Sequence, residues 1–291
     1  MRSSSVPQPF FGAWVGDRSV RMSNEGWITA GQMQTRHRFL TPAAVGGPLP
    51  VGADGRQLCP FEVCQSTMPD TGDHSGGCGN ITQTIMRHNT LRDVVNEVVK
   101  SAAGVGVWVQ KEPHLRGDAA YFGGLRPTAP PTDLRADTLF TTVDGIRLYV
   151  DYAFANPSSQ YLISAASAVD GGAGDISSKI KLTRYGTFFH NSRVIPCIVE
   201  TPGRVVDNGF LAALARMAVG EKDPGAGGVA YARVMAELRL RISVVVWRFN
   251  VASTQRLVRA VARRVAGGGV DFLPSVGEGG LGGGHGAAGG G

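Results

Sequence analysis

The chain has 291 residues, a formal net charge of +6 and 41 glycines, about twice the usual share of ~7%. Hydrophobic residues make up 43% and charged residues 18%, a balance that favours a packed core over a wholly disordered chain. The sequence contains no run of about 18 apolar residues, so it predicts no membrane span, and MRSSSVPQPF lacks the apolar stretch of a secretory signal. With only 4 cysteines, we expect metal ligands or core thiols rather than a disulfide framework.

Composition divides the chain into segments of different character. A Pro/Gly-rich stretch covers 42–55, a Gly-rich loop covers 220–228, and the end of the chain is so rich in glycine that we expect it to be disordered. The segments are a linker with helical potential over 1–55, a Cys- and Gly-rich segment over 56–86, a mixed segment over 87–219, a basic helix over 229–265 and a Gly-rich tail over 266–291.

The mixed segment alternates helical and strand patterns, with an Asp-Gly pair at 144–145 that is typical of a hairpin turn. The expected elements are a helix over 89–103, a strand over 105–109, a hairpin of strands 137–142 and 146–155, a helix over 177–185, a strand over 194–200 and a helix over 208–219. This order predicts an α/β fold with a mixed sheet.

Three of the cysteines and one histidine lie close together as Cys59-x4-Cys64-x9-His74-x3-Cys78. Zinc needs four soft or borderline ligands, and the glycines between these residues would let the backbone fold tightly around a small ion. The segment is too short and polar to form a core of its own, so a bound metal would account for its order. The alternative is a loop with three free thiols, and Cys197, in an apolar strand, is expected to be a core thiol.

Two aspartates are expected to face each other across the hairpin. With a turn at 144–145, Asp137 and Asp151 fall almost opposite each other, and two carboxylates form a hard-oxygen site suited to Mg²⁺. Such a metal can activate a water and stabilise charge on a phosphodiester, with a lysine nearby to offset that charge. Lys179 or Lys181, on the next expected helix, could supply it. The alternative is that both aspartates are strand-end or turn residues.

The basic helix over 229–265 carries eight arginines against one acid, Glu237. Its arginines could pair with phosphates while its apolar residues pack on the domain. The alternative is a solubilising face on a docked helix. The residues expected to contact nucleic acid at its end are Arg256, Arg259, Arg263 and Arg264.

Taken together, these blocks resemble the C-terminal part of a non-LTR retrotransposon polyprotein of the type with a restriction-like endonuclease. The resemblance covers roughly residues 14–250. The blocks that carry it are, in order, CPFEVC with DTGDHSGGC, RHNTLRDVV, GVGVWVQKEP, RADTLF, YVDYAFANP, KLTRY and IPCIVETPGR. In that family a CCHC zinc motif precedes a nuclease domain of the PD-(D/E)XK fold.

The resemblance implies a restriction-endonuclease-like mixed sheet flanked by helices and preceded by a small zinc module over 56–86. It implies that Asp137 and Asp151 bind Mg²⁺, that Lys181 is the charge partner with Tyr185 one turn later, and that Glu200 is a supporting acid. Two residues at the start of the RHNTLRDVV block would position the site or contact DNA, namely Arg87 and His88. The implied activity is the nicking of target DNA for primed reverse transcription in the nucleus, with DNA and the element's RNA as candidate partners and no membrane.

The sequence departs from the family pattern in several ways. Asp151-Tyr152-Ala153 has no lysine where D-x-K would place one, so the helix lysine is needed. Ala136 precedes Asp137, and Asp133 in PTDL is a second candidate acid upstream. The chain has no Tyr-x-Asp-Asp signature and no room for a polymerase, and we expect a fragment or derivative of a longer element. The alternative function is a catalytically inactive nucleic-acid-binding remnant.

Overall fold

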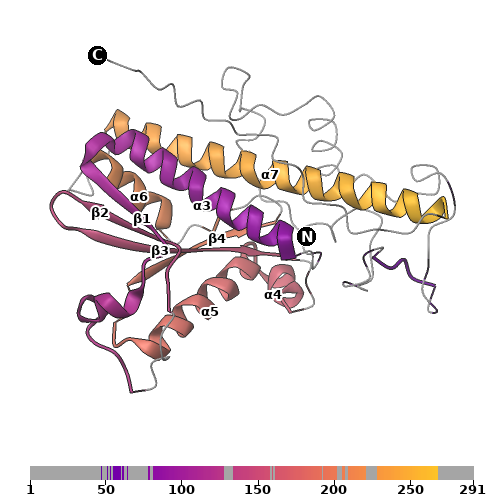
Figure 1. Ribbon diagram of the computed structural model, residues 1–291, viewed down its shortest axis with the longest axis horizontal. Coiled ribbons are helices and arrows are strands. Elements are labelled where there is room, and N and C mark those ends of the chain that lie inside the picture. Colours follow the sequence, from indigo (N-terminus) through magenta and orange to yellow (C-terminus); the bar gives the residue numbers. More distant parts are fainter. Residues whose placement is uncertain are drawn as a thin grey trace, which may run out of the picture.

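The computed structural model describes six stretches of the chain, namely 81–127, 134–157, 161–191, 193–201, 209–220 and 228–267, with positions 47, 51, 53, 55–59, 61, 64, 78, 159, 205 and 206. The elements within them are α3 (Ile81–Ala103), η4 (Gly104–Gly106), β1 (Val107–Lys111), η5 (Leu115–Phe122), β2 (Thr138–Thr142), β3 (Arg147–Ala155), α4 (Ile163–Ala168), α5 (Gly172–Phe188), β4 (Val194–Glu200), α6 (Phe210–Val219) and α7 (Val229–Val265) (Figure 1). The predicted helix over 24–40 and nearly all of the Gly-rich tail lie outside these residues.

The four strands form one mixed sheet in the order β1-β2-β3-β4. β1, β2 and β3 are antiparallel neighbours, and β3 pairs with β4 in parallel. The predicted α/β class with a mixed sheet is therefore confirmed. The predicted hairpin is confirmed too, because Gly145 at its turn has a φ of 79°, a left-handed conformation that glycine adopts without strain.

Several element bounds differ from those expected from the sequence. α3 begins at Ile81 rather than at residue 89, so the expected module boundary at 86/87 falls inside this helix. β1 begins two residues late, since Gly104 ends α3 with a φ of 58° and the short η4 turn follows. β4 occupies the expected residues, whereas η5 and α4 were not expected.

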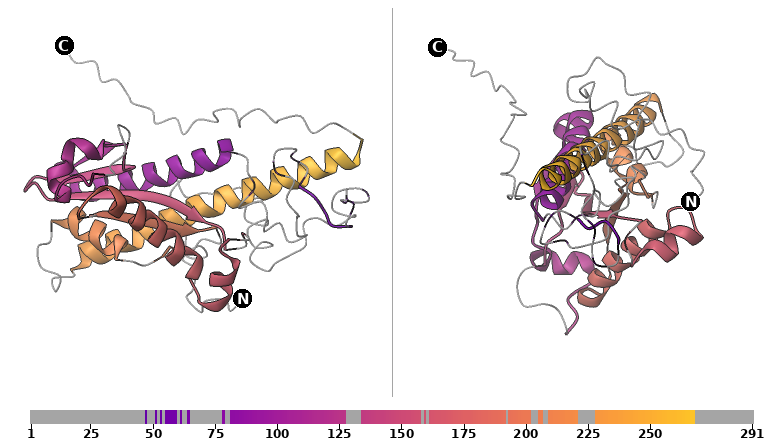
Figure 2. Two further views of the ribbon diagram at one scale, coloured as in Figure 1. Left: turned by 90° about the horizontal axis from the view of Figure 1, so that it is seen from below. Right: turned by 90° about the vertical axis from the view of Figure 1, so that its right-hand side faces the viewer.

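Helices cover both faces of the sheet. α3, α6 and α7 lie on one face, and α4 and α5 lie on the other (Figures 1 and 2). Residues of β3 alternate between the two cores, since Val150 and Tyr152 pack with α3, α6 and α7, whereas Tyr149 packs with α5 and η5. The sheet centre is thus reached by side chains from both layers.

The long helix α7 spans the residues predicted for the basic helix, but its middle is not amphipathic. All six residues from Ile242 to Trp247 are buried, so this part is surrounded on every side. Exposed arginines remain at its C-terminal end, at Arg259, Arg263 and Arg264. No helix in the described part of the chain is long and apolar enough to cross a membrane.

Candidate active site and cysteine cluster

The cleft that holds the predicted aspartates forms where the sheet loses one strand. β2 starts at Thr138, which pairs with Val150, so within the described residues the rest of β3 pairs only with β4. Continuing the β2–β3 register by one residue places Asp137 across from Asp151, and the Asp137 N–H donates to the Val150 carbonyl at 3.0 Å. The N–H of Tyr152, on the open side of β3, donates to Oδ2 of Asp137 at 2.6 Å. The expected opposition of the two aspartates is therefore present.

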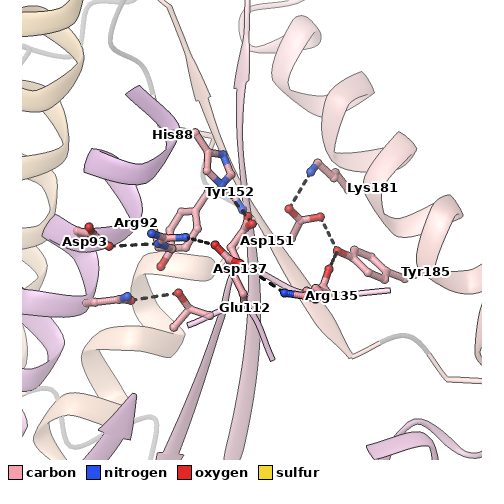
Figure 3. A network of polar contacts seen from close by, with 12 residues as sticks. His88, Arg92, Asp93, Glu112, Arg135, Asp137, Asp151, Tyr152, Lys181 and Tyr185 are labelled. Atoms are coloured by element: carbon pink, nitrogen blue, oxygen red, sulfur yellow. Dashed lines mark hydrogen bonds and ion pairs between the residues drawn. The ribbon is translucent and has the colours of Figure 1, made fainter. Parts of the chain in front are cut away.

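Asp151 is held by two side chains of α5. Nζ of Lys181 lies 2.7 Å from Oδ1 of Asp151, and the hydroxyl of Tyr185 donates to Oδ2 at 2.6 Å (Figure 3). Lys181 and Tyr185 are four residues apart, so one face of the helix presents both. Lys179, two residues before Lys181, is exposed and does not line the cleft, so Lys181 is the one of the two candidate lysines that lies at the site.

Asp137 is held from the other side, by α3. Nε2 of His88 lies 3.1 Å from Oδ1 of Asp137, and the His88 ring packs edge-on against Tyr152 (Figure 3). With the Tyr152 N–H on Oδ2, each oxygen of the two carboxylates has a protein nitrogen or hydroxyl as its partner, and the two carboxylates also contact each other. A carboxylate oxygen carries two lone pairs, so acceptor positions remain beside these contacts.

The two carboxylates differ in their electrostatic state. Burial raises the pKa of Asp151, and the nearby Asp137 carboxylate raises it further, although the Lys181 ammonium opposes both. Burial would also raise the pKa of Asp137, but hydrogen bonds with His88, Asp151 and the Tyr152 N–H outweigh it and bring that pKa below its usual value. Two adjacent carboxylates therefore titrate as a pair, and as the pH rises Asp151 keeps its proton longer than Asp137 does.

The cleft around this pair has a volume of about 370 Å³ and is richer in cations than in anions. Arg87 is 9% exposed, its guanidinium lies 4.3 Å from the centroid of the Phe154 ring, and burial lowers its pKa to about 10. Arg135 lies 3.7 Å from a carboxylate oxygen of Glu112. The lining residues are Thr84, Arg87, His88, Arg135, Asp137, Asp151, Tyr152, Ala153, Phe154, Lys181, Arg184 and Tyr185.

Besides the three residues that follow Asp151 on β3, three of these residues were missed by the sequence reasoning, namely Thr84, Arg135 and Arg184. A signal for two of them was present, because Arg135 stands in RADTLF and Arg184 stands in KLTRY. Strand alternation places residue 135 on the side of residue 137, and helical spacing places residue 184 beside residue 181. Thr84 lies in the part of α3 that the sequence pattern did not reveal.

Glu200, expected as a supporting acid of the metal site, is not part of this cleft. It pairs with Ala155, four residues beyond Asp151, a distance of about 13 Å along the strand. Its Oε1 accepts the N–H of Gly174 at 3.0 Å, and the side chain is buried. Because Gly174 lies in the first turn of α5, this carboxylate satisfies a helix N-terminus, and its place in the fold is structural.

The arginines expected to bind nucleic acid occupy two separate places. Arg87 lines the cleft, while the α7 residues Arg256, Arg259, Arg263 and Arg264 do not. Burial lowers the pKa of Arg256, which is partly covered, whereas the other three are exposed. These three are the exposed arginines at the described C-terminal end of the helix.

The three clustered cysteines converge on the end of α7. Their sulfur atoms all lie within 4.8 Å of one another, and the sulfurs of Cys59 and Cys78 are 3.7 Å apart. Cys59 packs with Leu257 and Val261 of α7, and Cys64 and Cys78 border the same cluster. A hydrogen bond with Cys78, together with burial, raises the pKa of the Cys59 thiol. Three sulfurs this close can bind a metal; His74, the expected fourth ligand, lies outside the described residues.

No protein-family model and no curated protein matches the chain. The residues of the cleft, and the sequence motifs that resemble those of non-LTR retrotransposon nucleases, are therefore what points to a function.

Proposed function

We propose that the α/β domain is a Mg²⁺-dependent DNA endonuclease of the restriction-like type, related to the nuclease region of non-LTR retrotransposons. The observation that carries this proposal is the pair Asp137 and Asp151 at the open edge of β3, with Nζ of Lys181 2.7 Å from Asp151. Two carboxylates and a lysine in one cleft are the groups that metal-assisted phosphodiester hydrolysis needs. Target nicking for primed reverse transcription, in the nucleus, would be its role.

The donor set suits Mg²⁺. Both carboxylates offer hard oxygens, and acceptor positions remain beside their contacts with protein donors. When bound, Mg²⁺ would activate a water and stabilise the charge of the phosphoryl oxygens. Asp137 and Asp151 would hold the ion, and the Lys181 ammonium would face the attacked phosphate. Tyr185 fixes Asp151 through Oδ2, and His88 fixes Asp137 through Oδ1.

Zinc would be the metal of the cysteine cluster, as a module before the nuclease domain. In a tetrahedral site with Zn–S bonds of about 2.3 Å, neighbouring sulfurs lie about 3.8 Å apart. The 3.7 Å between the sulfurs of Cys59 and Cys78 fits this spacing. Cys64 would be the third ligand and His74 the fourth. The packing of Cys59 on Leu257 and Val261 would attach this zinc module to the end of α7.

DNA is the proposed partner, and the exposed end of α7 is a second proposed contact. Arg259, Arg263 and Arg264 would neutralise backbone phosphates away from the cleft, and Arg256 would contribute less because it is partly buried. The element's RNA has the same backbone chemistry and could use the same arginines.

An inactive nucleic-acid-binding remnant is the second candidate. The observation that favours it is that the Lys181 ammonium already pairs with Asp151, and that Arg87, Arg135 and Arg184 leave the cleft with an excess of positive charge. Such a cleft could bind phosphates without cleaving them. This candidate predicts DNA binding with no change in DNA length or topology.

Nicking of supercoiled plasmid separates the two candidates. We expect the parent protein to convert supercoiled to open-circular DNA in Mg²⁺ and not in EDTA, and we expect Asp151→Ala to be inactive. Asp175→Ala is the matched control, because it removes an exposed carboxylate from the first turn of α5, away from the cleft. Nicking that survives in Asp151→Ala would refute the assignment of the site. If the parent protein binds plasmid without nicking it, the nuclease proposal is refuted and the nucleic-acid-binding remnant is supported.

A further inference from the structure

The cations of the cleft differ in whether the protein already uses them. Lys181 contacts Asp151, and Arg135 lies near Glu112. Arg87 is almost fully buried against the Phe154 ring. Arg184, in contrast, is exposed, and among the residues that the structure describes it has no ion-pair or hydrogen-bond partner. It is the cation of the cleft that is left for a ligand.

The position of Arg184 relates it directly to the proposed chemistry. It follows Lys181 by three residues on α5, a spacing that places their Cβ atoms about 5–6 Å apart on a helix surface. Its chain neighbour Tyr185 contacts Asp151, so Arg184 stands beside the carboxylate pair and nearer to solvent. Neighbouring phosphates of one nucleic-acid strand are separated by a distance of similar order.

We infer that Arg184 binds the phosphate next to the one that is attacked, and so fixes the register of the strand in the cleft. This inference rests on the proposed nuclease function of the same site. The guanidinium can donate two parallel hydrogen bonds to one phosphate, which gives both affinity and direction. Because the side chain is exposed and forms no ion pair or side-chain hydrogen bond among the described residues, its donors are available to a ligand.

The test is the salt dependence of DNA binding, measured without cleavage. A fluorescein-labelled duplex of about 20 base pairs is titrated with the full chain in EDTA, and anisotropy gives Kd at several salt concentrations. Arg184→Ala should bind about tenfold more weakly at 0.1 M salt, the effect of one charge-assisted hydrogen bond, and its log–log salt slope should fall by about 0.9. Arg184→Lys should keep the slope and lose only part of the affinity, because the point charge remains.

Lys179→Ala is the matched control, since it removes one exposed positive charge from the same helix outside the cleft. Its slope and Kd should stay near those of the parent. If Arg184→Ala and Lys179→Ala are indistinguishable, or if the parent does not bind the duplex, the inference is overturned. A loss specific to Arg184→Ala in a protein that never nicks plasmid would support the phosphate contact while refuting the nuclease. If the parent nicks plasmid and Arg184→Ala binds the duplex as tightly as the parent does, the nuclease would be supported and the phosphate contact of Arg184 refuted.

Discussion

The two carboxylates of the cleft should respond in opposite ways when each is neutralised. Asparagine replaces aspartate with almost no change of shape, so Asp137→Asn and Asp151→Asn form a matched pair. The raised pKa of Asp151 means that the folded protein favours its neutral form, whereas the lowered pKa of Asp137 means that the fold favours the charged form. Both variants should abolish nicking, but only Asp137→Asn should destabilise the protein at neutral pH.

The size of the effect follows from the contacts that each carboxylate makes. Asp137 accepts from the Tyr152 N–H and contacts His88, and charge-assisted hydrogen bonds of this kind are worth about twice as much as neutral ones. Because both side chains are partly exposed, we expect Asp137→Asn to lose about 1–2 kcal/mol of the free energy of unfolding. For a domain of this size, that corresponds to a fall in Tm of about 2–8 °C.

Asp151→Asn loses a charge whose burial was unfavourable. The asparagine amide can donate to the Tyr185 oxygen while its carbonyl accepts from Lys181, so both present contacts can be kept in neutral form. Lys181 is 24% exposed and can direct the rest of its charge to water. We expect a Tm equal to or above that of the parent at pH 7.

The pH dependence of the free energy of unfolding tests, a second time, whether each aspartate stabilises or destabilises the fold. For Asp137 the folded pKa is depressed, so its stabilising contribution is present above the unfolded pKa of about 3.9 and disappears as the pH falls through the folded value. For Asp151 the folded pKa is raised, so the parent loses stability as the pH rises above about 3.9 and through the folded value. Urea unfolding followed by circular dichroism between about pH 2 and 8 covers both ranges. If Asp151→Asn proves less stable than Asp137→Asn at pH 7, the electrostatic reasoning is wrong.

Three further predictions concern the metals and the basic helix. Elemental analysis of the purified full chain should find one zinc per chain, and Cys64→Ser should lose it and lower the Tm; a parent protein without zinc would contradict the assignment of Cys59, Cys64 and Cys78. Simultaneous replacement of Arg256, Arg259, Arg263 and Arg264 by alanine should reduce the log–log salt slope of DNA binding by up to about 3.6, and an unchanged slope would exclude this part of α7 from the binding surface. Mg²⁺ alone should raise the Tm only slightly, because the Lys181 ammonium already pairs with Asp151, and Ca²⁺ with duplex DNA should raise it more. Equal shifts with and without DNA would show that Lys181 does not oppose the cation.

The sequence was sufficient for the parts of the site that depend on local geometry. The Asp-Gly turn set the register of the hairpin, and the register alone placed Asp137 opposite Asp151. Helical periodicity placed Lys181 and Tyr185 on one face of α5 and turned Lys179 away. These relations involve residues close in sequence, so no knowledge of tertiary packing was needed.

The relations that failed depend on how distant segments meet. The resemblance placed Glu200 at the site, but the pairing of Asp151 with Pro196 is set by the parallel register, which no local pattern specifies. The first turns of α3 were missed because Ile85 and Met86 are exposed there, and a pattern of buried residues cannot reveal a helix end that packs on little. The resemblance placed His88 near the site, but its contact with Asp137 depends on how α3 packs against β3 and could not be read from the local pattern.

The electrostatics of Asp151 bear on whether the site is a nuclease or a remnant. A charged residue in the middle of an apolar strand, with a pKa raised by burial, lowers the stability of the fold at neutral pH, and asparagine would make the same hydrogen bonds without that loss. Asp137, whose charge the fold favours, could be explained by structure alone. Asp151 could not, because its contacts with Lys181 and Tyr185 do not compensate for its burial. Residues that oppose the stability of their own fold are expected where a function requires their chemistry, and an ionised oxygen is what Mg²⁺ requires. Of the two aspartates, Asp151 is therefore the one whose identity argues for catalysis rather than for phosphate binding alone.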